Sequence, residues 1–201
     1  MIAKLMLLLV VWGTGACLHM AADARSAELQ DGVSPNGKYA VIAVQKDNHG
    51  VIAYHVVHRA SGGILLRMKC SYQEMEGEGE DWSWGHGRSA VVTWRADGRC
   101  FALCEANHRG IGTVKMATAR DGEFREVNLD DEALIDFTRA PWAKVKVEFE
   151  EFDGPQRARM SVGGRVAYGD GPLLERAFIV TVRLSDGRPI KCRAEVTDAE
   201  K

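Results

Sequence analysis

The stretch Ser34-Pro35-Asn36-Gly37-Lys38-Tyr39-Ala40-Val41 combines a tight turn with the start of an apolar strand. The Asn-Gly pair supplies the positive φ angles that hairpin turns require. The residues after the turn, 38–45, and the next run, 51–59, are largely apolar on both strand faces, as central strands are. Similar pairs recur as Gly62-Gly63, Asp97-Gly98, Asp121-Gly122, Asp153-Gly154, Gly163-Gly164, Asp170-Gly171 and Asp186-Gly187. Short strands joined by tight turns predict an all-β fold.

Two runs in the C-terminal half, 144–149 and 178–184, alternate between apolar and polar residues, as half-buried strands do. Residues 144–149 carry charges on one of their faces, which suits an edge strand or a solvent-exposed face. These runs extend the predicted all-β fold into the second half of the chain.

One segment, 128–139 (NLDDEALIDFTR), has a helical pattern instead. Asn128 offers a cap, acidic residues occupy the first turn, apolar residues follow at helical spacing, and Pro141 closes the segment. We therefore expect one short helix, which would join subdomains at 30–128 and 140–197 within a single domain of 25–201.

The turn-and-strand pattern of 34–41 returns 61 residues later as Arg95-Ala96-Asp97-Gly98-Arg99-Cys100-Phe101-Ala102. A fainter third copy is Val162-Gly163-Gly164-Arg165-Val166-Ala167. The sequences SPNGKYAV and WRADGRCFA resemble the S-P-D-G-K and W-S-P-D-G-R motif of TolB-like and WD40-like β-propeller blades. This resemblance implies that each turn leads into a strand of a four-stranded antiparallel blade, and it implies little about activity.

The spacing of these copies departs from the propeller pattern. A WD40 blade repeats about every 40–45 residues, and propellers have about four or more blades. Here the two clear copies stand 61 residues apart and at most three exist. We therefore expect either an antiparallel propeller-like meander or a two-sheet β sandwich, with one short helix.

Charge and hydropathy exclude two classes of partner. The chain of 201 residues has 26 basic and 28 acidic residues, a net charge of −2, so we expect no general attraction to nucleic acid or to anionic membranes. After Leu18 no apolar run approaches the roughly 20 residues of a membrane span. The sequence contains no motif that predicts a cofactor or a metal site.

The N-terminal segment resembles a secretory signal peptide. Lys4 gives a positive start, residues 5–11 are an unbroken apolar run, and Ala22-Asp23-Ala24 has the small-x-small pattern of a cleavage site. We therefore expect residues 1–24 to be removed and the mature protein to be periplasmic or extracellular. Thr14-Gly15-Ala16-Cys17 is similar to a lipobox and offers an alternative, a lipid anchor at Cys17, but the residue at Thr14 departs from that motif.

Four cysteines remain in the expected mature chain: Cys70, Cys100, Cys104 and Cys192. In an oxidising compartment an even number predicts two disulfides. Cys100 and Cys104 lie on one face of one expected strand about 13 Å apart, beyond the roughly 7 Å that a disulfide spans, so each would pair with Cys70 or Cys192. The alternative is four buried thiols that pack as small core residues.

The acidic stretch 74–88 (EMEGEGEDWSWGHGR) is too polar and too rich in glycine for a core strand, so it predicts a long exposed loop. Trp82 and Trp84 could anchor a sugar or a protein, and His86 could act as an acid–base group. Arg88 and Arg109 are candidate polar contacts for the same ligand. The alternative is that the acids are simply solvated and the tryptophans pack onto the sheet.

These residues predict a binding or interaction module without catalytic residues, whose partner is an unknown protein or glycan. The alternative function is an extracytoplasmic hydrolase acting on envelope material, with His86 and a nearby carboxylate as acid and base. The two functions differ in geometry, because a hydrolase needs His86 within hydrogen-bond reach of that carboxylate in a cleft.

Overall fold

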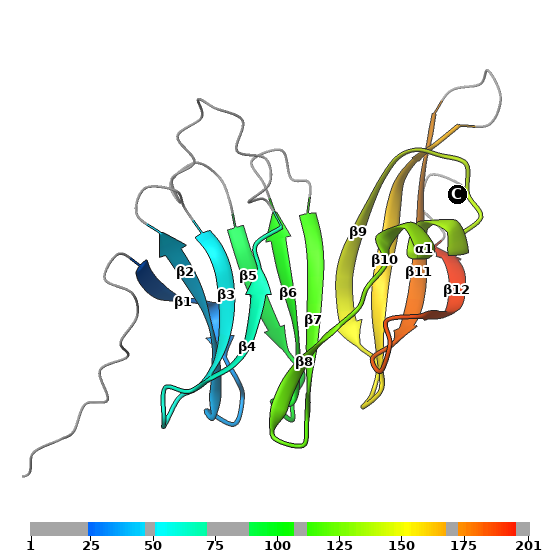
Figure 1. Ribbon diagram of the computed structural model, residues 1–201. Coiled ribbons are helices and arrows are strands. Elements are labelled where there is room, and N and C mark those ends of the chain that lie inside the picture. Colours follow the sequence, from blue (N-terminus) through cyan, green and yellow to red (C-terminus); the bar gives the residue numbers. More distant parts are fainter. Residues whose placement is uncertain (1–23, 47–50, 72–88, 107–111, 168–172, 196–201) are drawn as a thin grey trace, which may run out of the picture.

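The computed structural model describes residues 24–46, 51–71, 89–106, 112–167 and 173–195. Within these ranges the chain forms twelve strands and one short helix, so the predicted all-β fold with one helix is confirmed (Figure 1). The strands make two sheets, one of eight strands and one of four. Cys17 and most of the predicted signal peptide lie outside the described residues, and β1 begins at Ala24.

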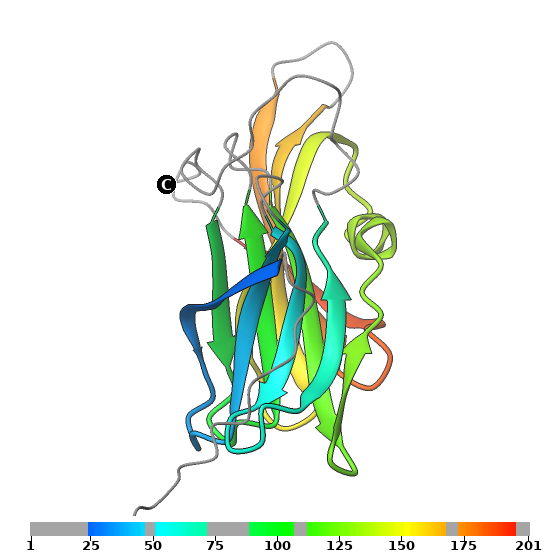
Figure 2. The ribbon, with the colours of Figure 1, turned by 60° about the vertical axis from the view of Figure 1, so that its left-hand side comes forward.

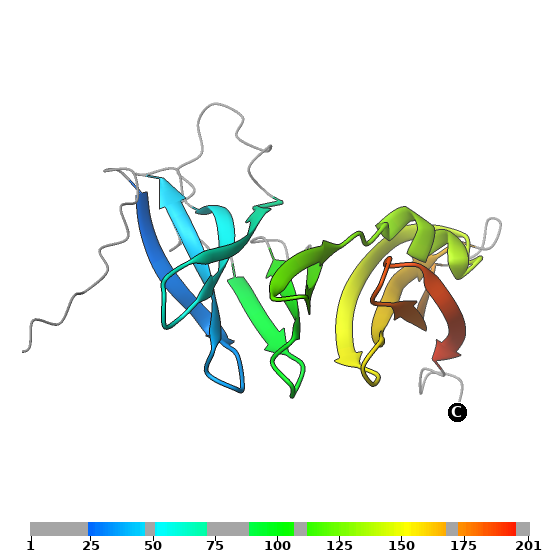
Figure 3. The ribbon, with the colours of Figure 1, turned by 60° about the horizontal axis from the view of Figure 1, so that its bottom comes forward.

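The eight-stranded sheet consists of two antiparallel meanders. The first contains β1 (Ala24–Val33), β2 (Tyr39–Lys46), β3 (Val51–His58) and β4 (Ile64–Lys69). The second contains β5 (Ser89–Trp94), β6 (Cys100–Ala106), β7 (Gly112–Arg120) and β8 (Glu123–Val127). The parallel pair β1–β5 joins them in the order β4-β3-β2-β1-β5-β6-β7-β8. The outer strands β4 and β8 lie side by side, so the sheet is nearly closed and barrel-like (Figure 3).

The four-stranded sheet follows the helix and has the order β12-β11-β10-β9. It is a third antiparallel meander, and β9, the predicted charged strand, is one of its edges. Strand β9 lies next to β7 of the eight-stranded sheet, and in Figure 2 the smaller sheet lies behind the larger one. Its elements are α1 (Asp131–Phe137), β9 (Trp142–Phe152), β10 (Arg157–Val166), β11 (Leu174–Arg183) and β12 (Pro189–Glu195).

Strand β6 is buried on both faces and separates two hydrophobic cores. Phe101 and Leu103 point into the first core, which fills the space between the two meanders of the larger sheet. Cys100 and Ala102 point into the second core, which lies between that sheet, α1 and the smaller sheet. The sequence of β6 is therefore apolar at successive positions, because side chains of alternating parity enter different cores.

The two copies of the turn motif have the same structure and touch each other. Asn36 and Asp97 each accept a hydrogen bond from the backbone N–H two residues later, at 3.0 and 2.9 Å, and the glycine after each has a φ angle near +67° (+68° and +66°). The Asn36 side-chain amide also donates to the carbonyl of Asp97 at 3.2 Å. The third proposed copy is wrong, because Gly163 and Gly164 lie inside β10 and pair with β9 and β11.

The predicted helix is present, but its cap differs from the prediction. Asp130, not Asn128, is the N-cap, and its side chain accepts a hydrogen bond from the backbone N–H of Ala133 at 3.1 Å. An aspartate at the N-cap satisfies a free N–H of the first turn and places negative charge at the positive end of the helix dipole. Leu134 is the fully buried residue of α1 and anchors it on the second core.

The prediction of two disulfides is wrong, because no pair among the described cysteines is bonded. Cys70 belongs to the first core, whereas Cys100 and Cys104 point to the opposite face of the larger sheet and contribute to the second. Cys192 packs against the second core from β12. The expected common face of Cys100 and Cys104 is confirmed, and the cysteines serve as small core residues.

The thiols should differ in reactivity by position. In the native protein we expect iodoacetamide to alkylate the half-buried Cys104 and Cys192 before Cys100, which is 0% exposed and whose pKa burial raises from 9.0 to about 12. Because this folded pKa lies above the unfolded value, the contribution of Cys100 to stability is complete below pH 9.0 and is lost as the pH rises toward about 12.

Mass spectrometry after alkylation in urea, without reductant, measures the outcome. All four described cysteines should then carry the label, and a cysteine-linked peptide pair would contradict the structure. Native alkylation at pH 8 provides the order of reaction. Alkylation of Cys100 as fast as Cys192 would mean that the second core opens readily.

Candidate functional site

The residues predicted to bind a ligand lie outside the described residues. Trp82, Trp84, His86 and Arg88 belong to the segment 72–88, and Arg109 belongs to 107–111. Their side chains therefore have no assigned position, but the strands from which the two segments leave are described. This places the starting points of both segments in the fold.

Both segments leave the same end of the larger sheet. The C-terminal end of β4, the N-terminal end of β5, the C-terminal end of β6 and the N-terminal end of β7 all lie at this end, on the upper side in Figure 1. The tight turns of the two repeated motifs lie at the opposite end. We call the end from which the segments 72–88 and 107–111 leave the upper end.

A buried carboxylate organises the upper end. Glu105, the second-last residue of β6, is only 2% exposed and points toward the first core. It accepts hydrogen bonds from the Ser71 hydroxyl at 2.6 Å, from the Ser71 backbone N–H at 3.3 Å, and from the Thr113 hydroxyl at 3.2 Å. The Cys70 thiol donates at 3.3 Å to Oε1, the oxygen that also accepts from the Ser71 N–H, whereas the two hydroxyls donate to Oε2. We call Glu105 with Cys70, Ser71 and Thr113 the Glu105 network.

Tyr54 of β3 also contacts the Glu105 network, through Cys70. Its hydroxyl lies 4.0 Å from Cys70 Sγ, and its pKa is raised far above the ordinary value of 10.0, first by burial and then by the negative charge of Glu105. The phenol therefore stays uncharged over the physiological pH range. In the described part of the chain no cationic side chain bonds to Glu105, so hydroxyl, thiol and amide donors hold it.

The Glu105 network connects the flanks of both segments. Ser71 immediately precedes 72–88, Glu105 lies two residues before 107–111, and Thr113 lies two residues after it. One carboxylate therefore fixes three strand ends from which the predicted binding residues extend. Because its oxygens are nearly inaccessible and already bonded, Glu105 is suited to holding these strand ends rather than to reacting with a substrate.

Sequence reasoning missed Glu105, although the sequence contains a signal for it. Glu105 has the same strand parity as Phe101 and Leu103, so it lies on the face that enters the first core. An acid at the apolar face of an otherwise apolar strand must be bonded when buried. The polar partners Ser71 and Thr113 come from distant and adjacent strands, and only the fold identifies them.

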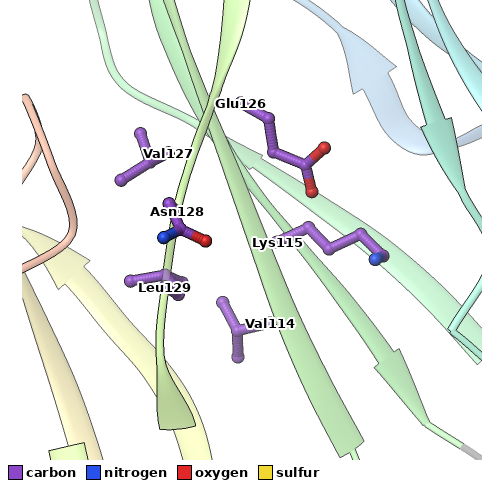
Figure 4. A pocket seen from close by; sticks show the side chains of 6 residues that line it. All are labelled: Val114, Lys115, Glu126, Val127, Asn128 and Leu129. Carbon is purple, nitrogen blue, oxygen red and sulfur yellow. The ribbon is translucent and has the colours of Figure 1, made fainter. Parts of the chain in front are cut away.

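A hollow of about 250 Å³ lies beside β7 and the end of β8 and is a second candidate site. Figure 4 shows Val127 and the charged pair Lys115 and Glu126 on different sides of the β8 ribbon. The remaining lining residues are Val114, Asn128 and Leu129. Because few polar groups converge on one point, this hollow is a weaker candidate than the upper end.

Searches for metal sites, for membrane-spanning helices and for similar proteins add no further candidate site. Within the described ranges no group of three His, Cys, Asp or Glu side chains is placed to hold a metal ion. The one helix among the described residues is not long and apolar enough to cross a membrane. No protein-family model, curated protein or solved structure matches this chain.

Proposed function

We propose that this protein is a secreted or periplasmic binding module that does not catalyse a reaction. Its ligand is a protein or glycan partner, contacted by the segments 72–88 and 107–111. Trp82 and Trp84 supply large aromatic contact areas, and His86, Arg88 and Arg109 supply polar contacts. The signal-peptide pattern of residues 1–24 supports the compartment.

One observation carries the proposal: the Glu105 network connects the flanks of both segments at one end of the larger sheet. Binding residues are commonly placed on loops that a rigid scaffold positions. A scaffold that fixes the strand ends flanking binding residues reduces the conformational entropy that binding costs. This supports a common binding surface for the five candidate residues.

The test compares the protein with the variant Trp82→Ala/Trp84→Ala. Both are used as baits in affinity capture from the native envelope fraction, with mass spectrometry of bound proteins and sugars. The proposal predicts a partner that is held by the wild type and lost by the variant. Leu173→Ala/Leu174→Ala is a matched control, because it removes two side chains that are 49% and 40% exposed elsewhere.

Two outcomes would count against the proposal. If the tryptophan variant unfolds, as seen by circular dichroism, the two rings belong to a core and not to a binding surface. If wild type and variant retain the same material, the segment 72–88 does not select the partner. Hydrolysis of envelope polymers by the wild type, lost in His86→Ala, would instead favour the hydrolase function.

A further inference from the structure

Strand β12 is an open sheet edge. Of the four outer strands, β4 and β8 lie beside each other, and β9 lies next to β7. In the described part of the molecule β12 pairs with β11 alone, and α1 is also in contact with it. Every second residue of β12 therefore points its backbone N–H and C=O away from β11, ready to pair with a further strand.

The two faces of β12 have different chemistry. Lys191 and Arg193 stand opposite Thr181 and Ile179 of β11, which carry no charge. Neither cation takes part in an ion pair within the described residues. Within the described residues this face therefore carries two cations that form no ion pair, and Glu195 adds one acid at the end of the strand.

Strand β12 also borders a cleft whose lining is partly apolar and partly charged. The cleft has a volume of about 800 Å³ between β12 and α1. Phe137 and Ile190 line it while remaining 39% and 46% exposed, together with Cys192 and the charged residues Asp136, Arg139 and Lys191. Exposed apolar side chains beside an open strand edge are typical of sites that accept an extended peptide.

A second copy of this chain is a poor occupant of this edge in the register that overlaps β12 over its full length. In an antiparallel pair of two β12 strands centred on Cys192, Lys191 would stand directly opposite Arg193 of the other copy. Like charges at directly opposed positions destabilise a strand pair. Charge complementarity instead favours a strand with carboxylates on this face.

We propose that β12 binds an extended segment of another protein by strand addition, and that this segment alternates acidic and apolar residues. Its acids face Lys191 and Arg193, and its apolar side chains enter the cleft beside Phe137 and Ile190. Backbone hydrogen bonds along the edge supply affinity, and the alternating pattern supplies specificity. This surface is separate from the upper end and does not depend on the segments 72–88 and 107–111.

The test uses a fluorescein-labelled Glu-Val-Glu-Val-Glu peptide and fluorescence anisotropy. We expect saturable binding to the wild-type protein, and Lys191→Glu/Arg193→Glu should weaken it by about tenfold or more. The same variant should gain affinity for Lys-Val-Lys-Val-Lys. Arg120→Glu/Arg125→Glu is the matched control, because it makes the same change in net charge at residues 76% and 65% exposed on β7 and β8.

Two further measurements separate strand addition from general charge attraction. Peptide binding should slow hydrogen exchange at β12 amides. N-methylation of every second peptide residue should abolish binding when it removes the N–H groups that face β12, and should have little effect when it removes the others. No saturable binding of the acidic peptide, or equal loss in the control variant, would overturn the proposal. Binding without protection of β12 would also overturn it, because the peptide would then lie elsewhere.

Discussion

Glu105→Ala is expected to lower the free energy of unfolding by about 2–4 kcal/mol. The substitution removes a buried carboxylate and leaves the Ser71 and Thr113 hydroxyls and the Cys70 thiol without their acceptor. Buried polar groups that lose a partner cost more than the bond itself contributes. Urea denaturation followed by tryptophan fluorescence measures the loss.

Two comparisons make this result specific. Glu105→Gln keeps the size and one acceptor oxygen, so it should cost less than Glu105→Ala. Glu123→Ala is the matched control, because this β8 glutamate is 70% exposed and should change stability by no more than about 0.5 kcal/mol. If Glu105→Ala and Glu123→Ala are equally stable, the network does not hold the upper end.

The variant Glu105→Gln also tests whether the Glu105 network affects ligand binding apart from its effect on stability. If the Glu105 network positions the binding segments, Glu105→Gln should weaken partner binding at temperatures where the protein remains folded. Hydrogen exchange should show faster opening at the Ser71 amide, which donates to Glu105. Unchanged binding together with faster exchange would mean that the network stabilises the sheet without positioning the ligand site.

Phe101→Ala is expected to have the largest effect, a loss of about 3–5 kcal/mol. Phe101 is 0% exposed and lies at the centre of an aromatic group, with ring centroids 4.9 Å from Trp94 and 5.9 Å from Phe124. Truncation would leave a cavity between the two meanders, and flanking strands can close it only in part because both are paired. Urea denaturation provides the measurement.

The control for Phe101→Ala is Phe137→Ala, which removes the same side chain where it is 39% exposed on α1. The control should cost less than about 1 kcal/mol, because little apolar surface is lost from the interior. Equal costs would contradict the position of Phe101 in the first core. The neighbouring Trp94 indole should also change its fluorescence in Phe101→Ala, because its environment becomes less densely packed.

Much of the fold could be predicted from local patterns. The Asn36-Gly37 and Asp97-Gly98 turns, the strands after them and the helix at α1 follow from backbone preferences and side-chain period, which act over a few residues. The charged strand at 144–149 indicated an edge for the same reason, since its charges need water. The prediction of a turn at Gly163-Gly164 is wrong because glycine also occurs inside strands, here in β10.

The sequence by itself determined the helix and many of the strands and turns, because hydrogen bonding and side-chain alternation within a short segment decide these elements. Only the tertiary structure decided which face of the sheet each cysteine enters, and therefore that Cys70 and Cys100 serve different cores. It also brought Ser71, Glu105 and Thr113 to one point and left β12 as the open edge. Such contacts depend on strand order, which nonlocal packing chooses among many arrangements compatible with the same local pattern.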